Sequence, residues 1–571
     1  MKTSFRDLYC GDVNEKIVDK EIKLCGWIKR IRILGGVIFF DLKDREGYVQ
    51  CVVEKKDENL YEIAKNLRIE DCIQIFGVVR ERKDKNPKIK TGNVEVLVKD
   101  IKVFSKSIDL PFLPEDDINV FEETRLKYRV LDLKRPQMQK NIIFKHKLIQ
   151  NIREFLNKRG FLEIETPFLS KSTPEGARDF LVPSRISPGK FYALPQSPQL
   201  YKQILMVSGF DRYYQIVKCF RDEDLRRDRQ PEFTQLDLEM SFVNEEDIFS
   251  LIEELFKEIL MKLLGIDLKI PFPRIKYEEC MKKYGSDKPD LRVGWEIKDF
   301  SNLLKNKGIN IFENSEVILG LQIDKDISRK DIEEINEFAI QNGGKGITYV
   351  KYFDSLKGPM AKFLKENDLI NGNTYIIVGD KKEKAFFILS KIREKCIKIL
   401  NPEFKENFSF LFITHFPLYV WDEEEKKWEP AHHPFTMPEE ILDIEIKNPE
   451  EIIGRQYDLV LNGVEIGSGS IRIHDPELQK KVLRKLGYSD EEIEKRFGFF
   501  LEALSFGAPP HGGIALGIDR IVACLLNLET IRDVIPFPKT AKGYALFEGA
   551  PSEVDKKQLE ELKLFIKHEE D

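Results

Sequence analysis

The sequence predicts a multidomain α+β protein in which a small N-terminal β-barrel precedes a larger region of mixed helices and strands. Three observations predict this fold class. The chain has 571 residues, which exceeds the size of a single hydrophobic core. Its N-terminal part contains short apolar runs separated by turn residues. Its later part alternates amphipathic helical patterns with strand patterns.

The N-terminal strands are expected in the segments KLCGWIKRIR, GGVIFFDLKD, YVQCVVEK, CIQIFGVVRER and NVEVLVKDIKVF. Five strands of this length predict a small barrel, and the OB-fold is the commonest barrel of this size. We expect the barrel to occupy residues 1–108. The segment SIDLPFLPEDD, with two prolines and an acidic cluster, is typical of a linker at its end.

A long amphipathic helix is expected over residues 136–160, because Pro136 suits a helix start and Gly160 suits a helix end. The segment FLEIETPFL follows as a strand, and Pro167 removes one backbone donor from it. That strand should therefore lie at a sheet edge or at a subunit boundary. The segment DIFSLIEELFKEILMKLLG predicts a further helix.

The next region is lysine-rich and mixed until about Ser409, and strand patterns then return in LFITHFPLYVWDEEE and QYDLVLNGVEIGSGSIRIH. Because the strands on both sides share one chemical character, we interpret the middle region as an inserted α+β module. The expected boundaries are 109–280 for the first part of the main domain, 281–415 for the insertion and 416–571 for the second part.

The overall composition is typical of a folded soluble protein, with a net charge of −6, 42% hydrophobic residues and 33% charged residues. No stretch approaches the roughly 20 apolar residues of a membrane helix, and MKTSFRDLYCGD lacks the apolar segment of a secretory signal. The eight cysteines are scattered without a CxxC pair. This spacing argues against zinc and disulfides and suits the cytoplasm.

A densely charged segment, FRDEDLRRDRQPEFTQLDLEM, lies between two expected strands at 212–220 and 233–240. Most such runs are solvated surface faces. In the second strand, however, Gln235, Asp237 and Glu239 alternate with apolar residues and share one face. A polar strand face with carboxylates beside arginines favours a floor for a small charged substrate.

Two later segments carry candidate chemistry. In DLVLNGVEIGSGSIRIH, Asp458 and Glu465 would suit Mg²⁺ bound together with substrate phosphates, although an ordinary hairpin with exposed charges explains them equally well. In GAPPHGGIALGIDRIVACLL, Arg520 at a helix start suits a phosphate, and an ion-paired arginine in a strand-to-helix connection is the alternative. No P-loop or Rossmann glycine motif occurs.

The paired histidines His432 and His433 in EPAHHPFT lack partner cysteines at zinc-ligand spacing. A histidine that hydrogen-bonds a carboxylate substrate is favoured over a zinc ligand.

Together these segments match a known family. RYYQIVKCFRDEDLRRDRQPEFTQLDLEMSF resembles motif 2 of the class II aminoacyl-tRNA synthetases, GFLEIETPFL resembles motif 1 and GGIALGIDR resembles motif 3. QSPQLYK, STPEGARDF, AHHPFT and GSDKPDLR further resemble the bacterial-type aspartyl-tRNA synthetases. The resemblance implies an antiparallel catalytic sheet flanked by helices, an OB-fold that binds the anticodon, and a cytoplasmic homodimer. It implies that L-aspartate and ATP form aspartyl-adenylate, from which tRNA-Asp is charged.

The resemblance also implies roles for single residues. The catalytic residues would be Arg221, Glu465 and Arg520. The L-aspartate would be bound by Glu175, Gln199, Lys202, Arg221, Asp237, His432 and Arg472. The ATP would be bound by Arg221, Asp222, Glu223, Gln230, Glu465, Gly517, Ile518, Asp519 and Arg520. Mg²⁺, which is expected as the only metal, would be held by Asp458 and Glu465. The tRNA anticodon would be read by Phe39, Gln50 and Glu95.

Three alternatives remain beside this interpretation. Asparaginyl- and lysyl-tRNA synthetases share the barrel and the motifs, but STPEGARDF, GSDKPDLR and the insertion argue against them. A catalytically silent RNA-binding relative should have lost Arg221, Glu465 or Arg520, all of which are present. An amino-acid ligase with another acceptor should lack the barrel. For Phe39, the alternative to a base-stacking role is a place in the barrel core.

Overall fold

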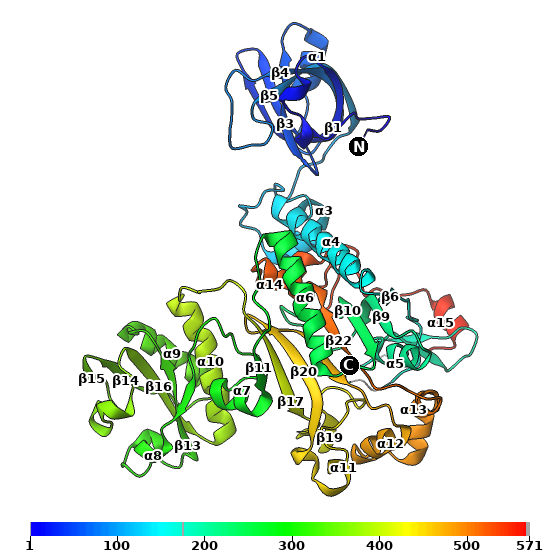
Figure 1. Ribbon diagram of the computed structural model, residues 1–571. Helices are drawn as coiled ribbons and strands as arrows, with labels where there is room; N and C mark the ends of the chain where they lie inside the picture. Colours follow the sequence, from blue (N-terminus) through cyan, green and yellow to red (C-terminus); the bar gives the residue numbers. More distant parts are fainter. Residues whose placement is uncertain (1, 174–175, 567–571) are drawn as a thin grey trace. The chain divides into compact units, whose positions relative to one another are not determined.

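The computed structural model describes residues 2–173 and 176–566 (Figure 1). The chain divides into two compact units, Met1–Gln139 and Lys140–Asp571. Glu175, which was expected to bind aspartate, lies outside the described residues.

The first unit is built on a closed barrel of five strands in the order β1-β2-β3-β5-β4. Their bounds are β1 Glu21–Leu34, β2 Val37–Asp44, β3 Gly47–Glu54, β4 Cys72–Glu81 and β5 Val94–Ser105. Strands β3 and β5 pair in parallel, and the other neighbours pair antiparallel. The predicted five-stranded OB barrel is confirmed.

Alternation of side chains explains why these segments close into a barrel. In β4, Ile73, Ile75, Gly77 and Val79 are buried, and the residues that alternate with them are partly exposed. Apolar residues on one face of every strand thus fill the interior. Helix α1, Glu58–Lys65, adds Leu60 and Ala64 to the same core.

The second unit contains an eight-stranded sheet in the order β11-β17-β20-β21-β22-β10-β9-β6. Its strands are β6 Leu162–Glu163, β9 Arg212–Phe220, β10 Glu232–Ser241, β11 Arg274–Lys276, β17 Phe410–Pro417, β20 Ile453–Leu461, β21 Val464–Ile471 and β22 His511–Gly517. All pairs are antiparallel except β11 with β17 and β6 with β9. Strand β6 lies at the sheet edge, as Pro167 in its segment predicted.

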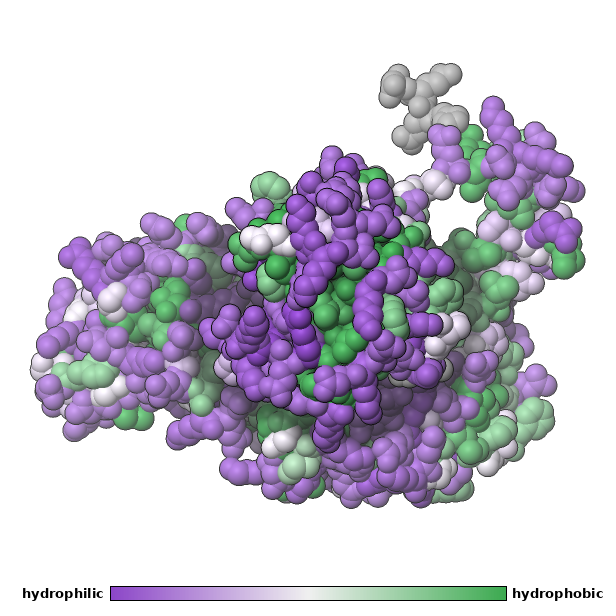
Figure 2. Space-filling model, turned by 90° about the horizontal axis from the view of Figure 1, so that it is seen from above, coloured by the Kyte–Doolittle hydropathy of each residue, from purple (hydrophilic) through white to green (hydrophobic). Residues whose placement is uncertain are grey.

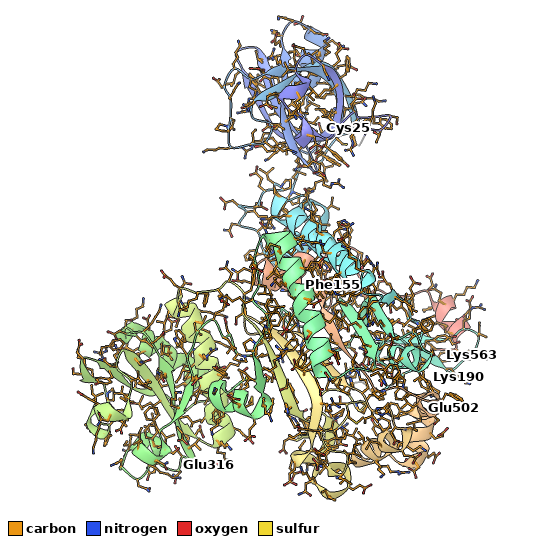
Figure 3. All side chains as sticks on the ribbon, viewed as in Figure 1. Cys25, Phe155, Lys190, Glu316, Glu502 and Lys563 are labelled. Carbon is orange, nitrogen blue, oxygen red and sulfur yellow. The ribbon has the colours of Figure 1, made fainter. Side chains whose placement is uncertain are left out.

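Two long helices cover apolar residues of this sheet. Helix α4, Pro136–Asn157, and helix α6, Glu245–Leu264, share one core with β10, β20 and β22. Phe155 of α4 is fully buried in that core (Figure 3). Helix α6 begins with a capping box at Asn244 and ends at Gly265 in the left-handed conformation. These caps satisfy terminal backbone groups, so the local sequence sets both helix ends.

The inserted region forms a second sheet of five strands in the order β12-β13-β16-β14-β15. The strands are β12 Ile297–Asp299, β13 Val317–Ile323, β14 Thr348–Phe353, β15 Ser355–Lys357 and β16 Asn373–Asp380. Helices α9, Arg329–Gln341, and α10, Lys382–Leu400, bury apolar residues against β13 and β16. This sheet has its own core, but the predicted division at residues 108, 280 and 415 stays a prediction.

The remaining helices are α2 Glu122–Lys127, α3 Arg129–Asp132, α5 Gln199–Val207, α7 Tyr277–Tyr284, α8 Ser301–Leu304, α11 Asp443–Ile446, α12 Pro476–Lys485, α13 Asp490–Ser505, α14 Ile518–Leu525 and α15 Lys556–Leu562. Two short hairpins are formed by β7 Leu181–Pro183 with β8 Phe191–Ala193 and by β18 Tyr419–Asp422 with β19 Lys427–Pro430. Figure 2 shows hydrophilic residues over most of one face of the molecule. Among residues 2–173 and 176–566, no helix has the length and apolar character of a membrane span.

Candidate active site

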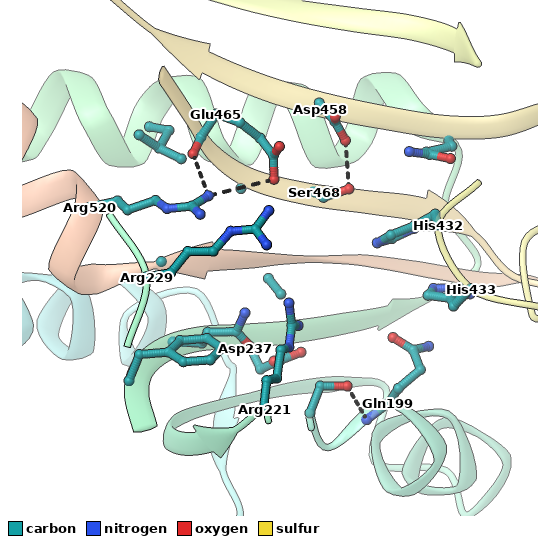
Figure 4. Close-up of a pocket in the computed structure, with 18 of the residues that line it drawn as sticks. Gln199, Arg221, Arg229, Asp237, His432, His433, Asp458, Glu465, Ser468 and Arg520 are labelled. Carbon is teal, nitrogen blue, oxygen red and sulfur yellow. Dashed lines mark hydrogen bonds and ion pairs between the residues drawn. The ribbon is translucent and has the colours of Figure 1, made fainter. Parts of the chain in front are cut away.

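A cavity of about 460 Å³ opens in the second unit above strands β10, β21 and β22 (Figure 4). Most of the predicted substrate residues line it: Gln199, Lys202, Arg221, Glu223, Gln230, Asp237, His432, Asp458, Glu465, Arg472, Gly517, Asp519 and Arg520. Asp222 and Ile518 do not line it, and the side chain of Ile518 is fully buried in the core. The structure therefore brings residues from five separate segments to one site.

A buried group of two cations and two carboxylates lies at one end of the cavity, which three of its members, Lys202, Asp237 and Arg472, line. Lys202 Nζ donates to Asp237 Oδ1 at 2.5 Å and lies 3.3 Å from Glu239 Oε2. Arg472 Nε and Nη2 donate to the two carboxylate oxygens of Glu239 at 2.9 and 3.1 Å. Each cation is 1% exposed and each carboxylate is fully buried. The formal charges cancel, so burying the four groups together avoids an unpaired charge.

The guanidinium of Arg472 makes further contacts besides Glu239. Nη1 donates to His433 Nε2 at 2.5 Å and to Ser470 Oγ at 2.6 Å, and Nη2 donates to Gly513 O at 3.2 Å. A guanidinium has five N–H groups, and each of them has an acceptor among the described residues. A substrate carboxylate that binds Arg472 therefore has to replace or share one of these acceptors.

The charges of Arg472 and Lys202 affect the protonation states of Glu239 and of the two neighbouring histidines. Burial raises the pKa of Glu239, but the positive charges of Arg472 and Lys202 outweigh it and lower the pKa below its usual value. Burial lowers the pKa of His432 and of His433 well below the usual range, and Arg472 and Lys202 lower both further. Both rings are consequently neutral near pH 7. Their centroids lie 4.3 Å apart.

Several buried polar atoms at the cavity have no hydrogen-bond partner among the described residues. They are Gln199 Nε2, Arg221 Nε, Asp237 Oδ2 and His432 Nδ1. Buried polar groups are normally paired, so unpaired ones that converge on a cavity indicate a polar ligand. The Oδ2 atom of Asp237 is a free acceptor, which suits an ammonium group.

The other end of the cavity is rich in arginine. Arg520, in the first turn of α14, donates from Nη1 to the backbone oxygen of Glu465 at 3.1 Å and lies 3.4 Å from Asp228 Oδ2. Arg229 donates to Glu223 Oε2 at 3.1 Å. Figure 4 shows the guanidinium groups of Arg221, Arg229 and Arg520 around the same space. Three guanidiniums beside a helix N-terminus favour binding of phosphate groups.

Two residues expected at the nucleotide make contacts within the protein instead. Gln230 exchanges hydrogen bonds with the backbone of Lys539, at 3.0 Å from Nε2 and 2.7 Å to Oε1. Asp519 accepts from the Thr234 backbone N–H at 2.9 Å and forms an ion pair with Lys145 of α4. These contacts hold the walls of the site, so a direct contact of either side chain with ATP stays a prediction.

The candidate metal ligands Asp458 and Glu465 lie on β20 and β21. Ser468 Oγ donates to Asp458 Oδ1 at 2.6 Å. Burial, and then the neighbouring charge of Glu465, raise the pKa of Asp458 to about 8. A bound cation would offset the repulsion between two neighbouring carboxylates of this kind. Two carboxylates suit Mg²⁺ that also binds substrate phosphates, and the described residues contain no cluster of three or more ligands for a metal.

The predicted anticodon residues lie on neighbouring strands of the barrel unit. Phe39 of β2 is partly exposed and does not belong to the core, whereas its neighbours Ile38 and Phe40 do. Gln50 of β3 donates to Glu95 of β5 at 2.7 Å. Three arginines that were not predicted complete this face: Arg32, Arg80 and Arg82. Alternation with apolar residues in β1 was the available signal for Arg32, whereas Arg82 lies just beyond the end of β4.

The sequence did not predict the contacts that three other residues make in the cavity region. Glu239 and His433 hold Arg472, and Lys288 lies 3.3 Å from Glu465 Oε2. Alternation along the strand predicted that Glu239 shares a face with Asp237, but it did not predict Arg472 as its partner. The partners of His433 and Lys288 are distant in the chain and left no local signal.

Comparisons with known proteins find relatives over nearly the whole chain. Residues 121–541 match the family described as tRNA synthetases class II (D, K and N), and residues 22–104 match the OB-fold nucleic acid binding domain. The chain is 49% identical to an Aspartate--tRNA(Asp/Asn) ligase of Aquifex aeolicus (strain VF5), over 98% of each protein. It is also 49% identical to the ligase of the same name from Dictyoglomus turgidum, over 99% of each protein.

Two solved structures share the fold. An asparaginyl-tRNA synthetase from Pyrococcus horikoshii complexed with asparaginyl-adenylate superposes with a TM-score of 0.60 at 22% identity, over 93% of this chain and 98% of that one. A putative aspartyl-tRNA synthetase from Leishmania major Friedlin gives a TM-score of 0.60 at 19% identity, over 92% of each chain.

Proposed function

Because the chain belongs to the class II aminoacyl-tRNA synthetases, and among them to the aspartate–tRNA(Asp/Asn) ligases, we propose how its cavity performs that reaction. The enzyme activates L-aspartate with ATP, which yields aspartyl-adenylate and pyrophosphate. It then transfers the aspartyl group to the 3′ end of tRNA.

The buried group of Lys202, Asp237, Glu239 and Arg472 is the observation that carries the proposal for the amino acid. Arg472 and Lys202 bind the side-chain carboxylate of aspartate, with Arg472 exchanging its contact to His433 or Ser470 for the substrate. Asp237 Oδ2 and the side-chain oxygen of Gln199 accept hydrogen bonds from the α-ammonium group, and His432 closes the pocket as a neutral ring. Asparagine would place an NH₂ group against these two cations, and such a mismatch discriminates by about 10⁴.

ATP lies toward the arginine-rich end. Arg221 bridges the α-carboxylate of aspartate and the α-phosphate, where negative charge builds as the carboxylate oxygen attacks phosphorus and pyrophosphate departs. Arg520 binds the terminal phosphate, and Glu223 contacts the nucleotide. Class II synthetases use Mg²⁺ with ATP, and Asp458 and Glu465 would hold the ion, which would neutralise phosphate charge. No protein nucleophile is required, because alignment and charge stabilisation accelerate phosphoryl transfer.

The tRNA binds through both units. Phe39 stacks on an unpaired anticodon base, and Gln50 and Glu95 contact base edges. The relatives named above carry tRNA(Asp/Asn) in their names, and on that ground we include tRNA-Asn as a second substrate. A homodimer in the cytoplasm, expected from the family resemblance, completes the proposal, and sedimentation velocity tests the dimer.

The decisive experiment is ATP–pyrophosphate exchange by the purified protein with aspartate, asparagine or lysine as the amino acid. Exchange that depends on aspartate alone is the expected result. Charging of tRNA-Asp and tRNA-Asn transcripts then separates the two acceptors. Exchange with asparagine, or with none of the three, would overturn the assignment of the pocket.

A further inference from the structure

The segment GSDKPDLR, residues 285–292, has no role in the reaction proposed above. It follows helix α7 and precedes the inserted sheet, yet Asp287 lines the cavity. The next residue, Lys288, places Nζ 3.3 Å from Glu465 Oε2, and its side chain is 44% exposed. The segment thus carries a cation to the carboxylate that we propose as a metal ligand.

Helix α10 holds this segment at one side. Arg393 of α10 is buried and donates to the backbone oxygens of Asp290, Val293 and Trp295 at 2.6, 2.8 and 2.9 Å. Gly285 also approaches α10 closely, since a Cβ atom there would lie 2.3 Å from Phe386 O. The course of the segment is therefore set by α10.

The catalytic sheet contacts the other side of the segment. A Cβ atom on Gly463, in the turn between β20 and β21, would lie 3.2 Å from Cβ of Asp290. Glu465 is two residues beyond this turn. A continuous set of contacts thus runs from Arg393 through residues 288–290 to the carboxylate of Glu465.

Two cations flank Glu465. Lys288 lies at Oε2, and Arg520 Nη1 lies 3.9 Å from Oε1. A divalent ion that binds Glu465 alone would be repelled by both. Phosphate groups would remove this repulsion, because they offer both cations a new partner.

We propose that Lys288 is the resident counter-ion of Glu465 and pairs with the phosphates of the nucleotide when it arrives, so that metal and nucleotide bind together. The inference rests on the proposed metal site at Glu465. It gives the inserted region a function in activation, which is to hold Lys288 at the metal ligand. Binding coupling is reciprocal. With Lys288 present, the nucleotide therefore increases the affinity for the metal ion, and the metal ion increases the affinity for the nucleotide by the same factor.

The test measures Mn²⁺ binding to the full-length protein by electron paramagnetic resonance, with and without an ATP analogue that cannot release pyrophosphate. In Lys288→Met, Mn²⁺ should bind roughly tenfold more tightly in the absence of nucleotide, because a neighbouring positive charge is gone. The ATP analogue should also increase Mn²⁺ affinity less in Lys288→Met than in the wild type, by a similar factor. Unchanged or weaker Mn²⁺ binding without nucleotide would overturn the proposal.

Three further variants complete the design. Lys282→Met removes an exposed lysine of α7 and should behave like the wild type. Arg393→Lys keeps the positive charge but loses the hydrogen bonds to the three backbone carbonyls. It should shift Mn²⁺ affinity in the same direction as Lys288→Met. An unchanged Mn²⁺ affinity would show that helix α10 does not position Lys288. Glu465→Gln should abolish tight Mn²⁺ binding. If it does not, the metal site itself is wrong, which separates that failure from a failure of Lys288.

Discussion

Arg472 and Glu239 form a bidentate ion pair across 233 residues of sequence, with nitrogen-to-oxygen distances of 2.9 and 3.1 Å. The pair is closed off from solvent and shares its carboxylate with Lys202. It orients the guanidinium before any substrate is present. A preoriented cation loses little conformational freedom when it binds a carboxylate, which favours affinity.

Replacing Arg472 with alanine should abolish aspartate-dependent pyrophosphate exchange, by about 10³-fold or more, while ATP still binds. The physical reason is that one of two cations of the pocket is lost and Glu239 is left with Lys202 alone. Arg455→Ala is a matched control, because Arg455 also makes a bidentate pair, with Glu245, at 2.7 and 2.5 Å, away from the cavity lining. Near-normal exchange in Arg472→Ala would remove Arg472 from the aspartate site.

A glycine on β22 makes room for the ion pair. A Cβ atom on Gly513 would lie 2.2 Å from Glu239 Oε2 and 2.1 Å from the backbone oxygen of Leu238. Gly513→Ala should therefore cost about 1–3 kcal/mol of stability and raise the KM for aspartate. Gly517→Ala on the same strand has no contact closer than 3.8 Å and should leave the melting temperature unchanged. Equal melting temperatures for both variants would contradict this account.

The fold was largely predictable because its signals are local. Alternation identified the five barrel strands, β9 and β10, and proline and glycine marked the ends of α4 and α6. The candidate site was predictable where chemistry is concentrated in short segments, as around Arg221, Glu465 and Arg520.

The remaining parts of the site depend on contacts between distant segments. The sequence does not reveal that Asp519 faces Lys145 or that Gln230 faces the backbone of Lys539, because side-chain direction is set by the packing of α4 and the C-terminal segment. The same reason explains why Lys288 was not connected with Glu465. Long-range pairs of this kind leave no periodic pattern in one sequence.

The neutral state of His433 makes stability depend on pH. Its pKa is lowered in the folded protein by burial and by the charges around it, so the unfolded chain, with a histidine pKa of about 6.5, takes up the proton first. The free energy of unfolding of the wild type should therefore decrease as the pH falls below 6.5, because His433 is protonated in the unfolded chain but not in the folded one. The loss amounts to roughly 1 kcal/mol at pH 5.5.

The variant His433→Gln isolates this contribution. Its free energy of unfolding should be lower than that of the wild type at pH 7.5, and the difference should narrow by roughly 1 kcal/mol at pH 5.5. Urea unfolding followed by tryptophan fluorescence measures both values. A difference that stays constant between the two pH values would show that His433 is not kept neutral by the fold.

Substitution of Phe39 tests whether the barrel unit binds tRNA without taking part in amino-acid activation. Its ring lies outside the barrel core and beside Arg32, which pairs with it across β1 and β2. Stacking of one base on an aromatic ring contributes about 1–3 kcal/mol, so Phe39→Ala should weaken tRNA-Asp binding by roughly tenfold or more. Aspartate-dependent pyrophosphate exchange without tRNA should be unchanged, because this step uses only the cavity of the second unit. Filter binding and exchange on the same preparation provide both numbers. If tRNA affinity is retained, Phe39 does not stack on the anticodon, and if exchange falls as well, the substitution has damaged more than the RNA-binding face.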